Sequence, residues 1–156
     1  MHAFTPLNSN NLLTAGNTLT QRTFRTSIND VIVKMDIRGM ADGQKAGISH
    51  FGSPDYSTIG VSCIGNKKFL EYGLKEKTIQ GPVINKDILW LKSTWGLDGK
   101  SHYYYSIDGE LFIPFGETYQ MLWESYRGDR VAIFNYNNKS SSGYVDVDYF
   151  HYSMQK

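Results

Sequence analysis

Short segments of alternating apolar and polar residues, separated by glycine-containing turns, run through almost the whole chain. Residues 30–38 are the clearest case, because every second residue from Val31 to Ile37 is apolar. Turn pairs such as Asp42-Gly43 separate these segments, and no long stretch shows the apolar period of a helix. The pattern predicts an all-β fold, a two-sheet antiparallel β-sandwich.

The last two segments, residues 130–136 and 143–152, are predicted to pair as a closing hairpin across the polar connection 137–142. In the second segment the alternation places Val145, Val147 and Tyr149 on one face and Asp146, Asp148 and Phe150 on the other. Aliphatic side chains on one face and carboxylates on the other predict a half-buried strand.

The chain has 156 residues, which fits one domain with a single core. We expect an irregular N-terminal segment at residues 1–11, followed by one sandwich module at residues 12–156. The single cysteine, Cys63, excludes an internal disulfide. The first 20 residues lack the basic start and apolar run of a signal peptide, and no segment predicts a membrane span. The parent protein could be cytoplasmic or secreted.

The charge balance excludes some classes of partner. The net charge is +1 with 20% charged residues, which gives no electrostatic reason to expect binding to nucleic acid or to an anionic membrane. Aromatic residues make up 14% of the chain, and 11 of them are tyrosines. Flat aromatic faces suit sugar rings, although tyrosine is also common in strands for packing reasons alone.

Signatures of catalysis are missing from the sequence. There is no Gly-x-Ser-x-Gly elbow, and the phosphate-loop look-alike at residues 60–67 has Asn66 where lysine is required. The four histidines, His2, His50, His102 and His151, do not show the spacing of a zinc site.

Asp146 and Asp148 are a carboxylate pair that could take part in catalysis or bind a metal ion. Two residues along a strand separate them by roughly 6.5–7 Å, whereas a retaining glycosidase needs carboxyl groups about 5–5.5 Å apart. Catalysis is therefore disfavoured. A structural calcium ion bound by these carboxylates is the metal hypothesis, and a plain hydrogen-bonded or solvated pair is the alternative that stays open.

Seven motifs occur in the order found in one known family. They are NTLTQRTF at 17–24, GMADG at 39–43, AGI at 46–48, IGV at 59–61, YYSIDG at 104–109, IFNY at 133–136 and GYVDVDYF at 143–150. Together they resemble the C-terminal concanavalin A-like, xylan-binding module of glycoside hydrolase family 43 β-xylosidases and α-arabinofuranosidases. The likeness spans residues 12–152.

The resemblance implies a concanavalin A-like jelly roll attached to a catalytic propeller that carries the acids of the reaction. The chain itself is then a non-catalytic carbohydrate-binding module for xylan-type hemicellulose, such as xylan or arabinoxylan. The alternative is a structural accessory domain, which packs on the propeller and shapes its active-site cleft without binding sugar. A small free-standing glycosidase is the third reading.

Two departures from the family pattern lead to further expectations. Family modules begin with an additional N-terminal strand, where this chain has residues 1–11. A missing first strand would leave an open sheet edge, which predicts a homodimer paired through that edge. The second departure is Trp90, at a position where the family pattern implies a polar or basic residue. An exposed tryptophan is expected either to be covered by another part of the protein or to contact a ligand.

The expected ligand-binding residues start from this tryptophan. If residues 87–95 and 101–107 pair, Trp90, His102 and Tyr104 share one surface, which could stack against sugar rings. Arg22, Gln21 or Lys92 could then hydrogen-bond to hydroxyl groups of the sugar. The alternative is that this face packs on the second sheet and the Leu89 face lies outside.

Overall fold

The structure is a computed structural model that describes residues 1–3, 12, 18–52, 55–123 and 128–156. The described residues form strands, turns and loops, and none of them lies in an α-helix. In this part of the chain, no helix has the length and apolar character needed to cross a membrane.

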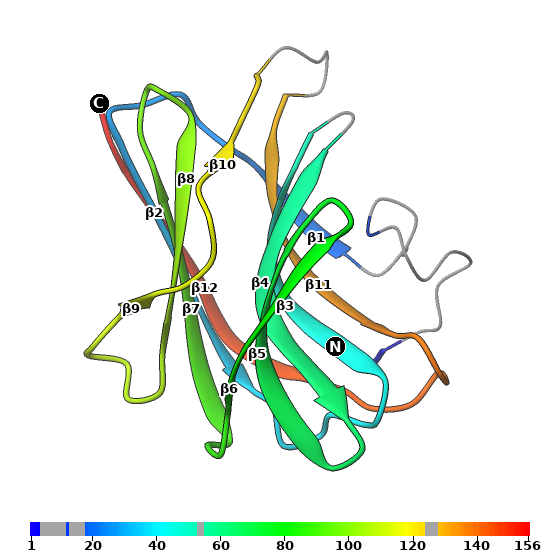
Figure 1. Ribbon diagram of the computed structural model, residues 1–156. Coiled ribbons are helices and arrows are strands. Elements are labelled where there is room, and N and C mark those ends of the chain that lie inside the picture. Colours follow the sequence, from blue (N-terminus) through cyan, green and yellow to red (C-terminus); the bar gives the residue numbers. More distant parts are fainter. Residues whose placement is uncertain (4–11, 13–17, 53–54, 124–127) are drawn as a thin grey trace.

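Two antiparallel sheets face each other (Figure 1). The first sheet has the strand order β1 (Thr18–Arg22), β11 (Arg130–Asn137), β3 (Gln44–Phe51), β4 (Tyr56–Ile64), β5 (Lys67–Leu74) and β6 (Lys77–Val83). The second has the order β10 (Tyr119–Gln120), β8 (Lys100–Ser106), β7 (Ile88–Trp95), β2 (Ile28–Asp36) and β12 (Asp146–Gln155), with β9 (Ile113–Pro114) paired to β8. The predicted sandwich is confirmed.

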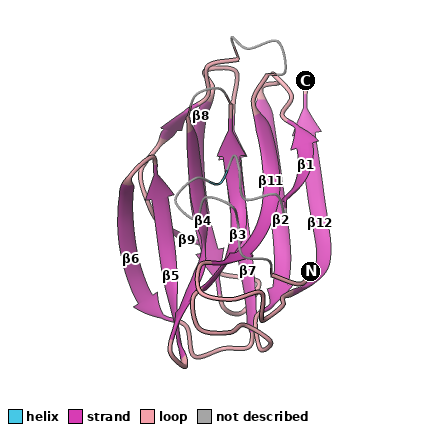
Figure 2. Ribbon diagram, turned by 90° about the vertical axis from the view of Figure 1, so that its right-hand side faces the viewer, coloured by secondary structure: helices cyan, strands magenta, loops and turns pink. Residues whose placement is uncertain are grey.

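The core lies between the two sheets and follows the strand alternation. Val31, Val33 and Met35 of β2 point inward and are at most 1% exposed. They meet apolar side chains of the first sheet, such as Ile48 and Ile59. Figure 2 shows the first sheet turned toward the viewer, with β5 and β6 at one side of it. Its far face covers the core, so its near face is available for function.

The predicted closing hairpin is wrong. β11 lies between β1 and β3 in the first sheet, whereas β12 pairs with β2 at an edge of the second sheet. The polar connection carries the chain from one sheet to the other instead of folding back on β11. Asn137 holds this connection, because its amide donates to the carbonyls of Asp42 and Ser142. Sequence alternation cannot distinguish a hairpin from such a crossing.

The predicted facing of β12 is correct only in its first half. A bulge between Val147 and Tyr149 shifts the register against β2. As a result Tyr149 points outward, where its hydroxyl accepts a hydrogen bond from Trp90 Nε1. Phe150 and Tyr152 instead pack on the core, although Phe150 was expected on the carboxylate face. One extra residue in a strand reverses every side chain that follows it.

Residues 1–3 run beside residues 143–145. The Ala3 amide donates to the Gly143 carbonyl, and the Val145 amide donates to the Met1 carbonyl. The rest of the expected irregular segment, residues 4–11, lies outside the described residues. The pairing places the start of the chain next to the loop that leads into β12.

His50 is buried between the sheets, and its lowered pKa predicts how the stability of the fold depends on pH. Burial lowers the pKa of this imidazole from 6.5 to about 3, and its Nε2 lies 2.7 Å from the Ser93 hydroxyl. The imidazole of His50 is therefore protonated in the unfolded chain below about pH 6.5, whereas in the folded chain it is protonated only below about pH 3. We expect the free energy of unfolding to decrease by up to about 1.4 kcal/mol per pH unit as the pH falls through this window.

Urea unfolding of the wild type and of His50→Gln at pH 7, 6, 5 and 4 measures this contribution. The variant loses packing at every pH, but its free energy of unfolding should fall less steeply between pH 6 and 4 than that of the wild type. Equal slopes would show that His50 does not carry the pH dependence.

Candidate functional site: a pocket on the outer face of the first sheet

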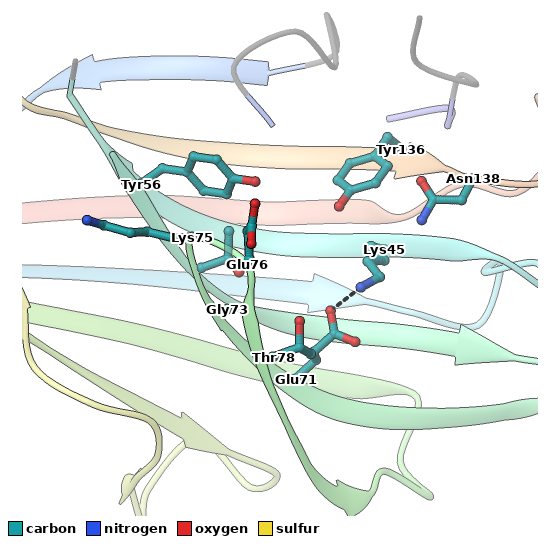
Figure 3. A pocket seen from close by; sticks show the side chains of 10 residues that line it. Lys45, Tyr56, Glu71, Gly73, Lys75, Glu76, Thr78, Tyr136 and Asn138 are labelled. Atoms are coloured by element: carbon teal, nitrogen blue, oxygen red, sulfur yellow. Dashed lines mark hydrogen bonds and ion pairs between the residues drawn. The ribbon is translucent and has the colours of Figure 1, made fainter. Parts of the chain in front are cut away.

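A pocket with a volume of about 410 Å³ lies on the outer face of the first sheet (Figure 3). Ten residues from β11, β3, β4, β5, β6 and the adjoining turns line it. They are Lys45, Tyr56, Thr58, Glu71, Gly73, Lys75, Glu76, Thr78, Tyr136 and Asn138. Its volume is within the range of small-molecule sites.

A row of outer-face residues that ends at the lining residue Glu71 crosses the strands beside the pocket. Phe134 of β11 is opposite Gly47 of β3, Gly47 is opposite Gly60 of β4, and Gly60 is opposite Glu71 of β5. A Cβ atom at Gly47 would lie 2.2 Å from the Ile59 carbonyl oxygen, and one at Gly60 would lie 2.1 Å from that of Ala46. The close approach of the two backbones requires glycine at both positions. The middle of the row therefore has no side chains, and both glycines are buried.

An ion pair forms one side of the pocket. Lys45 Nζ lies 2.5 Å from Glu71 Oε1, and both side chains are partly covered, at 28% and 17% exposure. Lys45 belongs to β3 and Glu71 to β5, so their side chains meet over the intervening strand β4 (Figure 3). The pair holds an ammonium group and a carboxylate in fixed positions beside the glycine row. Such a pair can donate to one hydroxyl group and accept from its neighbour.

Aromatic residues close the pocket toward β11. Leu12 and Phe134 form a small buried cluster on the outer face of the sheet, and Tyr56 and Tyr136 pack against it. The rings of Phe134 and Tyr136 have their centroids 5.9 Å apart. Burial raises the pKa of Tyr136, so its phenol is neutral at physiological pH. The closed end therefore combines apolar ring surface with a neutral hydroxyl group.

The opposite side, over the edge strand β6, is open. Thr78 and Gln80 of this strand are exposed. The turn between β5 and β6 contributes Lys75, whose ammonium lies 2.8 Å from the Asp55 carboxylate, and Glu76. The lining thus contains two lysines and two glutamates. This balance, together with threonine hydroxyls and an asparagine amide, suits a neutral ligand that has many hydroxyl groups.

The three expected platform residues share one surface, on the other sheet. β7 and β8 pair, with Trp90 opposite Ser106, Lys92 opposite Tyr104 and Thr94 opposite His102. Leu89 and Leu91 are fully buried, so the Trp90 face is the outer face of the second sheet. Whether this surface binds a ligand stays a prediction.

Trp90 is packed by its neighbours. Its Nε1 donates to the Tyr149 hydroxyl at 3.1 Å, and the Lys34 ammonium lies 5.6 Å from the ring centroid. Gly109 also lies against the ring, since a Cβ atom there would be 3.0 Å from it. The exposed position predicted for Trp90 is thus partly covered by its own chain, which reduces the area left for stacking.

Arg22 and Gln21 lie on the other sheet from Trp90. Both belong to β1, at the edge of the first sheet beside β11. Arg22 is opposite Arg130, and the Gln21 amide donates to the Arg22 carbonyl. The structure does not bring them together with His102 and Tyr104, because β1 belongs to the first sheet whereas β8 belongs to the second.

The two predicted calcium ligands do not form a cation site with other acids. Asp148 Oδ2 lies 2.6 Å from Lys34 Nζ, and this hydrogen bond raises the pKa of Lys34. Asp146 is exposed and lies before the bulge. Among the described residues, no three His, Cys, Asp or Glu side chains gather as a metal site. The donor set does not fit calcium, and the ion stays a prediction from the sequence.

Thermal unfolding with and without a chelator tests the ion directly. Because Asp148 already has a cationic partner in Lys34, we expect EDTA to leave the melting temperature unchanged to within about 1 °C. A ligand that binds only the folded state stabilises it. A clear decrease with EDTA that added calcium reverses would restore the calcium hypothesis.

Sequence reasoning missed the pocket residues, although one signal was present. Lys45, Glu71 and Tyr136 come from three strands and have no common motif. The signal was a glycine inside a strand, Gly73 of β5, which lines the pocket. A glycine within a strand often marks a close approach of backbones or a ligand.

The sequence matches the family described as the beta xylosidase C-terminal concanavalin A-like domain over residues 5–153. A beta-xylosidase of Formosa agariphila is 35% identical over 141 residues, which is 88% of this chain and 23% of that protein. The chain therefore spans about a quarter of the length of this curated relative.

Two solved structures cover the whole chain with a TM-score of 0.88. One is a bifunctional GH43-CE protein of Bacteroides eggerthii, which is 28% identical and of which the match covers 21%. The other is a GH43 glycoside hydrolase with an engineered active site that displays endo-xylanase and exo-arabinofuranosidase activity. It is 27% identical, and the match covers 34% of it. In both cases this chain corresponds to one part of a larger enzyme.

Proposed function

Because the chain belongs to the family of β-xylosidase C-terminal concanavalin A-like domains, we propose that it is a non-catalytic module that binds xylan-type polysaccharide. We place its binding site in the outer-face pocket of the first sheet. The observation that carries the proposal is the pocket itself, which is lined by the Lys45–Glu71 ion pair, two tyrosines and threonine hydroxyls.

The chemistry of the lining supports a sugar ligand. Tyr56 and Tyr136 offer ring surface for the apolar C–H groups of a pyranose, and the ion pair matches adjacent hydroxyl groups. The relatives support xylan, since their names refer to β-xylosidase and endo-xylanase activity. The acids that cleave the glycosidic bond would then belong to the rest of the parent enzyme.

The second candidate function is a domain that packs on the catalytic domain of the parent enzyme and shapes its cleft. It is favoured by the turn between β8 and β9, where Ile107 is 45% exposed and Leu111 is 66% exposed. Exposed apolar side chains of this kind are common where one domain meets another. The two functions use different surfaces, so both can hold for one chain.

Isothermal titration calorimetry of this chain with xylan, arabinoxylan and xylo-oligosaccharides tests the binding function. We expect weak but saturable binding, and none with cellulose oligosaccharides of equal length at the same concentration. The absence of heat with every xylan-type ligand at millimolar concentration would refute the binding function and leave the packing function as the account of the module.

A further inference from the structure

We infer that a second, smaller pocket, at one end of the first sheet, binds an anionic group carried by a sugar, either a carboxylate or a sulfate ester. Its volume is about 200 Å³. Three lysines, two asparagines and one aspartate supply its polar lining, and they are Asn66, Lys67, Lys68, Asn85, Lys86 and Asp87. This lysine pocket is separate from the outer-face pocket, and the proposed function assigns it no role.

The lysine pocket is anchored to both sheets. It lies between the turn that joins β4 to β5 and the connection that leads from β6 to β7. The Ile84 amide donates to the Lys68 carbonyl at 2.8 Å, which ties the connection to β5. The Ile37 amide, directly after β2, donates to the Asp87 carbonyl at 2.8 Å. The lining residues are therefore held in place by the backbone of the sandwich.

The three lysines carry charge that their own chain does not neutralise. Within the described part of the chain, six lysines form ion pairs with carboxylates, whereas Lys67, Lys68 and Lys86 form none. Together with Asp87 they give the lining a net charge of +2, although the whole chain carries only +1. The outer-face pocket differs, because both of its lysines face carboxylates.

The acids near the lysine pocket have another cation beside them. Arg38 Nη2 lies 2.5 Å from Asp36 Oδ2. The pKa of Arg38 is raised mainly by Asp36 and to a smaller extent by the Asp87 carboxylate. Lys68 contributes a little to the lowered pKa of Asp36, but Arg38 is the main cause of that shift. Both carboxylates are thus offset by the guanidinium, and the lysine ammonium groups remain available to a ligand.

The size and the charge of the lysine pocket define the ligand class. Lysine is a compact point charge with three donors, which suits an oxyanion, and the asparagine amides can bind neighbouring hydroxyl groups. A volume of about 200 Å³ is below the usual range for whole small molecules, so one substituent fits and a chain does not. Nucleic acid requires a surface that neutralises several phosphates, and a net charge of +1 provides none.

Strand β5 runs from the lysine pocket to the outer-face pocket. Lys67 and Glu71 lie on the same face of this strand, because they are four residues apart, which is roughly 13 Å along the strand. A polysaccharide that places neutral sugars beside Glu71 can therefore present an acidic branch to Lys67. The second pocket would select polysaccharides that carry such branches.

Chemical-shift titrations with glucuronate, a sulfated glucose and neutral glucose test the inference on this chain. We expect at least one anion to move the amide signals of Lys67, Lys68 and Lys86, less so when added salt screens the charges, and glucose to leave them in place. A response to glucuronate alone identifies a carboxylate site, and a response to the sulfated sugar alone identifies a sulfate site. No response to either anion would overturn the inference, as would equal changes at Lys100, an exposed lysine of β8 outside the pocket.

A double variant locates the anion. Lys67→Gln with Lys86→Gln should weaken binding of the responding anion by roughly fivefold to tenfold, since one pair of exposed charges contributes up to about fivefold. Lys100→Gln should leave that affinity within about twofold of the wild type. Unchanged binding of the anion by the double variant would overturn the inference. The double variant should still bind xylobiose as the wild type does, which also shows that it is folded. A wild type that binds the anion but not xylobiose would overturn the proposed function alone.

Discussion

Replacement of Lys45 by methionine is expected to reduce the affinity for xylo-oligosaccharides by roughly 10- to 100-fold. The substitution keeps the aliphatic stem of the side chain but removes the ammonium that lies beside the glycine row. A hydrogen bond to a charged group contributes about 1.5–3 kcal/mol, and 1.4 kcal/mol corresponds to a factor of ten in affinity. Calorimetry with xylobiose measures the change, and thermal unfolding confirms that the variant is folded.

The second sheet offers a matched control for this variant. Lys92 forms an ion pair with Asp30 at the same 2.5 Å distance and with similar exposure, 24% and 25%. It lies on the surface that carries Tyr104. Lys92→Met should leave the affinity within about twofold of the wild type. If Lys92→Met weakens binding and Lys45→Met does not, the ligand binds the second sheet, as the sequence predicted, and the pocket is not the site.

The largest loss of stability is expected from Gly47→Ala. The new Cβ atom would lie 2.2 Å from the Ile59 carbonyl oxygen and 2.5 Å from the Gly60 Cα atom. Both are backbone atoms in the middle of paired strands, so they cannot move without separating β3 from β4. We expect a cost of about 3 kcal/mol in the free energy of unfolding, at the upper end of the range for overpacking. Urea unfolding measures it.

Gly65→Ala serves as the comparison. Gly65 has a positive φ of 60°, but a Cβ atom there meets no atom within 4 Å. Only the left-handed backbone is penalised, at about 1 kcal/mol. The account requires Gly47→Ala to be clearly the more destabilising of the two. A Gly47→Ala variant as stable as Gly65→Ala would show that β3 and β4 separate easily at this point.

Alternation in the sequence predicts the strands that bury one face. The inward positions of β2 and β7 are apolar except for Asn29 and Ser93, and these inward sides form the core. β6 shows no such pattern, because it lies at a sheet edge and most of its residues are exposed. An edge strand with both faces exposed has no alternation to detect.

The partners of each strand were harder to predict than the strands. The sequence gives no sign that β11 and β12 belong to different sheets, since the polar loop between them would suit a hairpin equally well. The bulge at Asp148 cannot be recognised in the sequence either, because one unpaired residue leaves the composition of the strand unchanged. The position of Tyr149 beside Trp90 depends on that bulge.

The pocket could not be predicted from a local pattern. Lys45 and Glu71 meet only because β3, β4 and β5 are neighbours in this register. The prediction chose Trp90 because a tryptophan on an exposed face is conspicuous in a sequence, whereas the residues that line the pocket come from several strands and share no motif.

Mapping of amide chemical shifts during a titration with xylobiose tests the central claim most directly. The proposed site predicts that the changes concentrate at Lys45, Thr58, Gly73 and Tyr136, on the outer face of the first sheet. Changes concentrated instead at Trp90, His102 and Tyr104 would move the site to the second sheet. A spectrum without changes at saturating xylobiose would contradict sugar binding by this module.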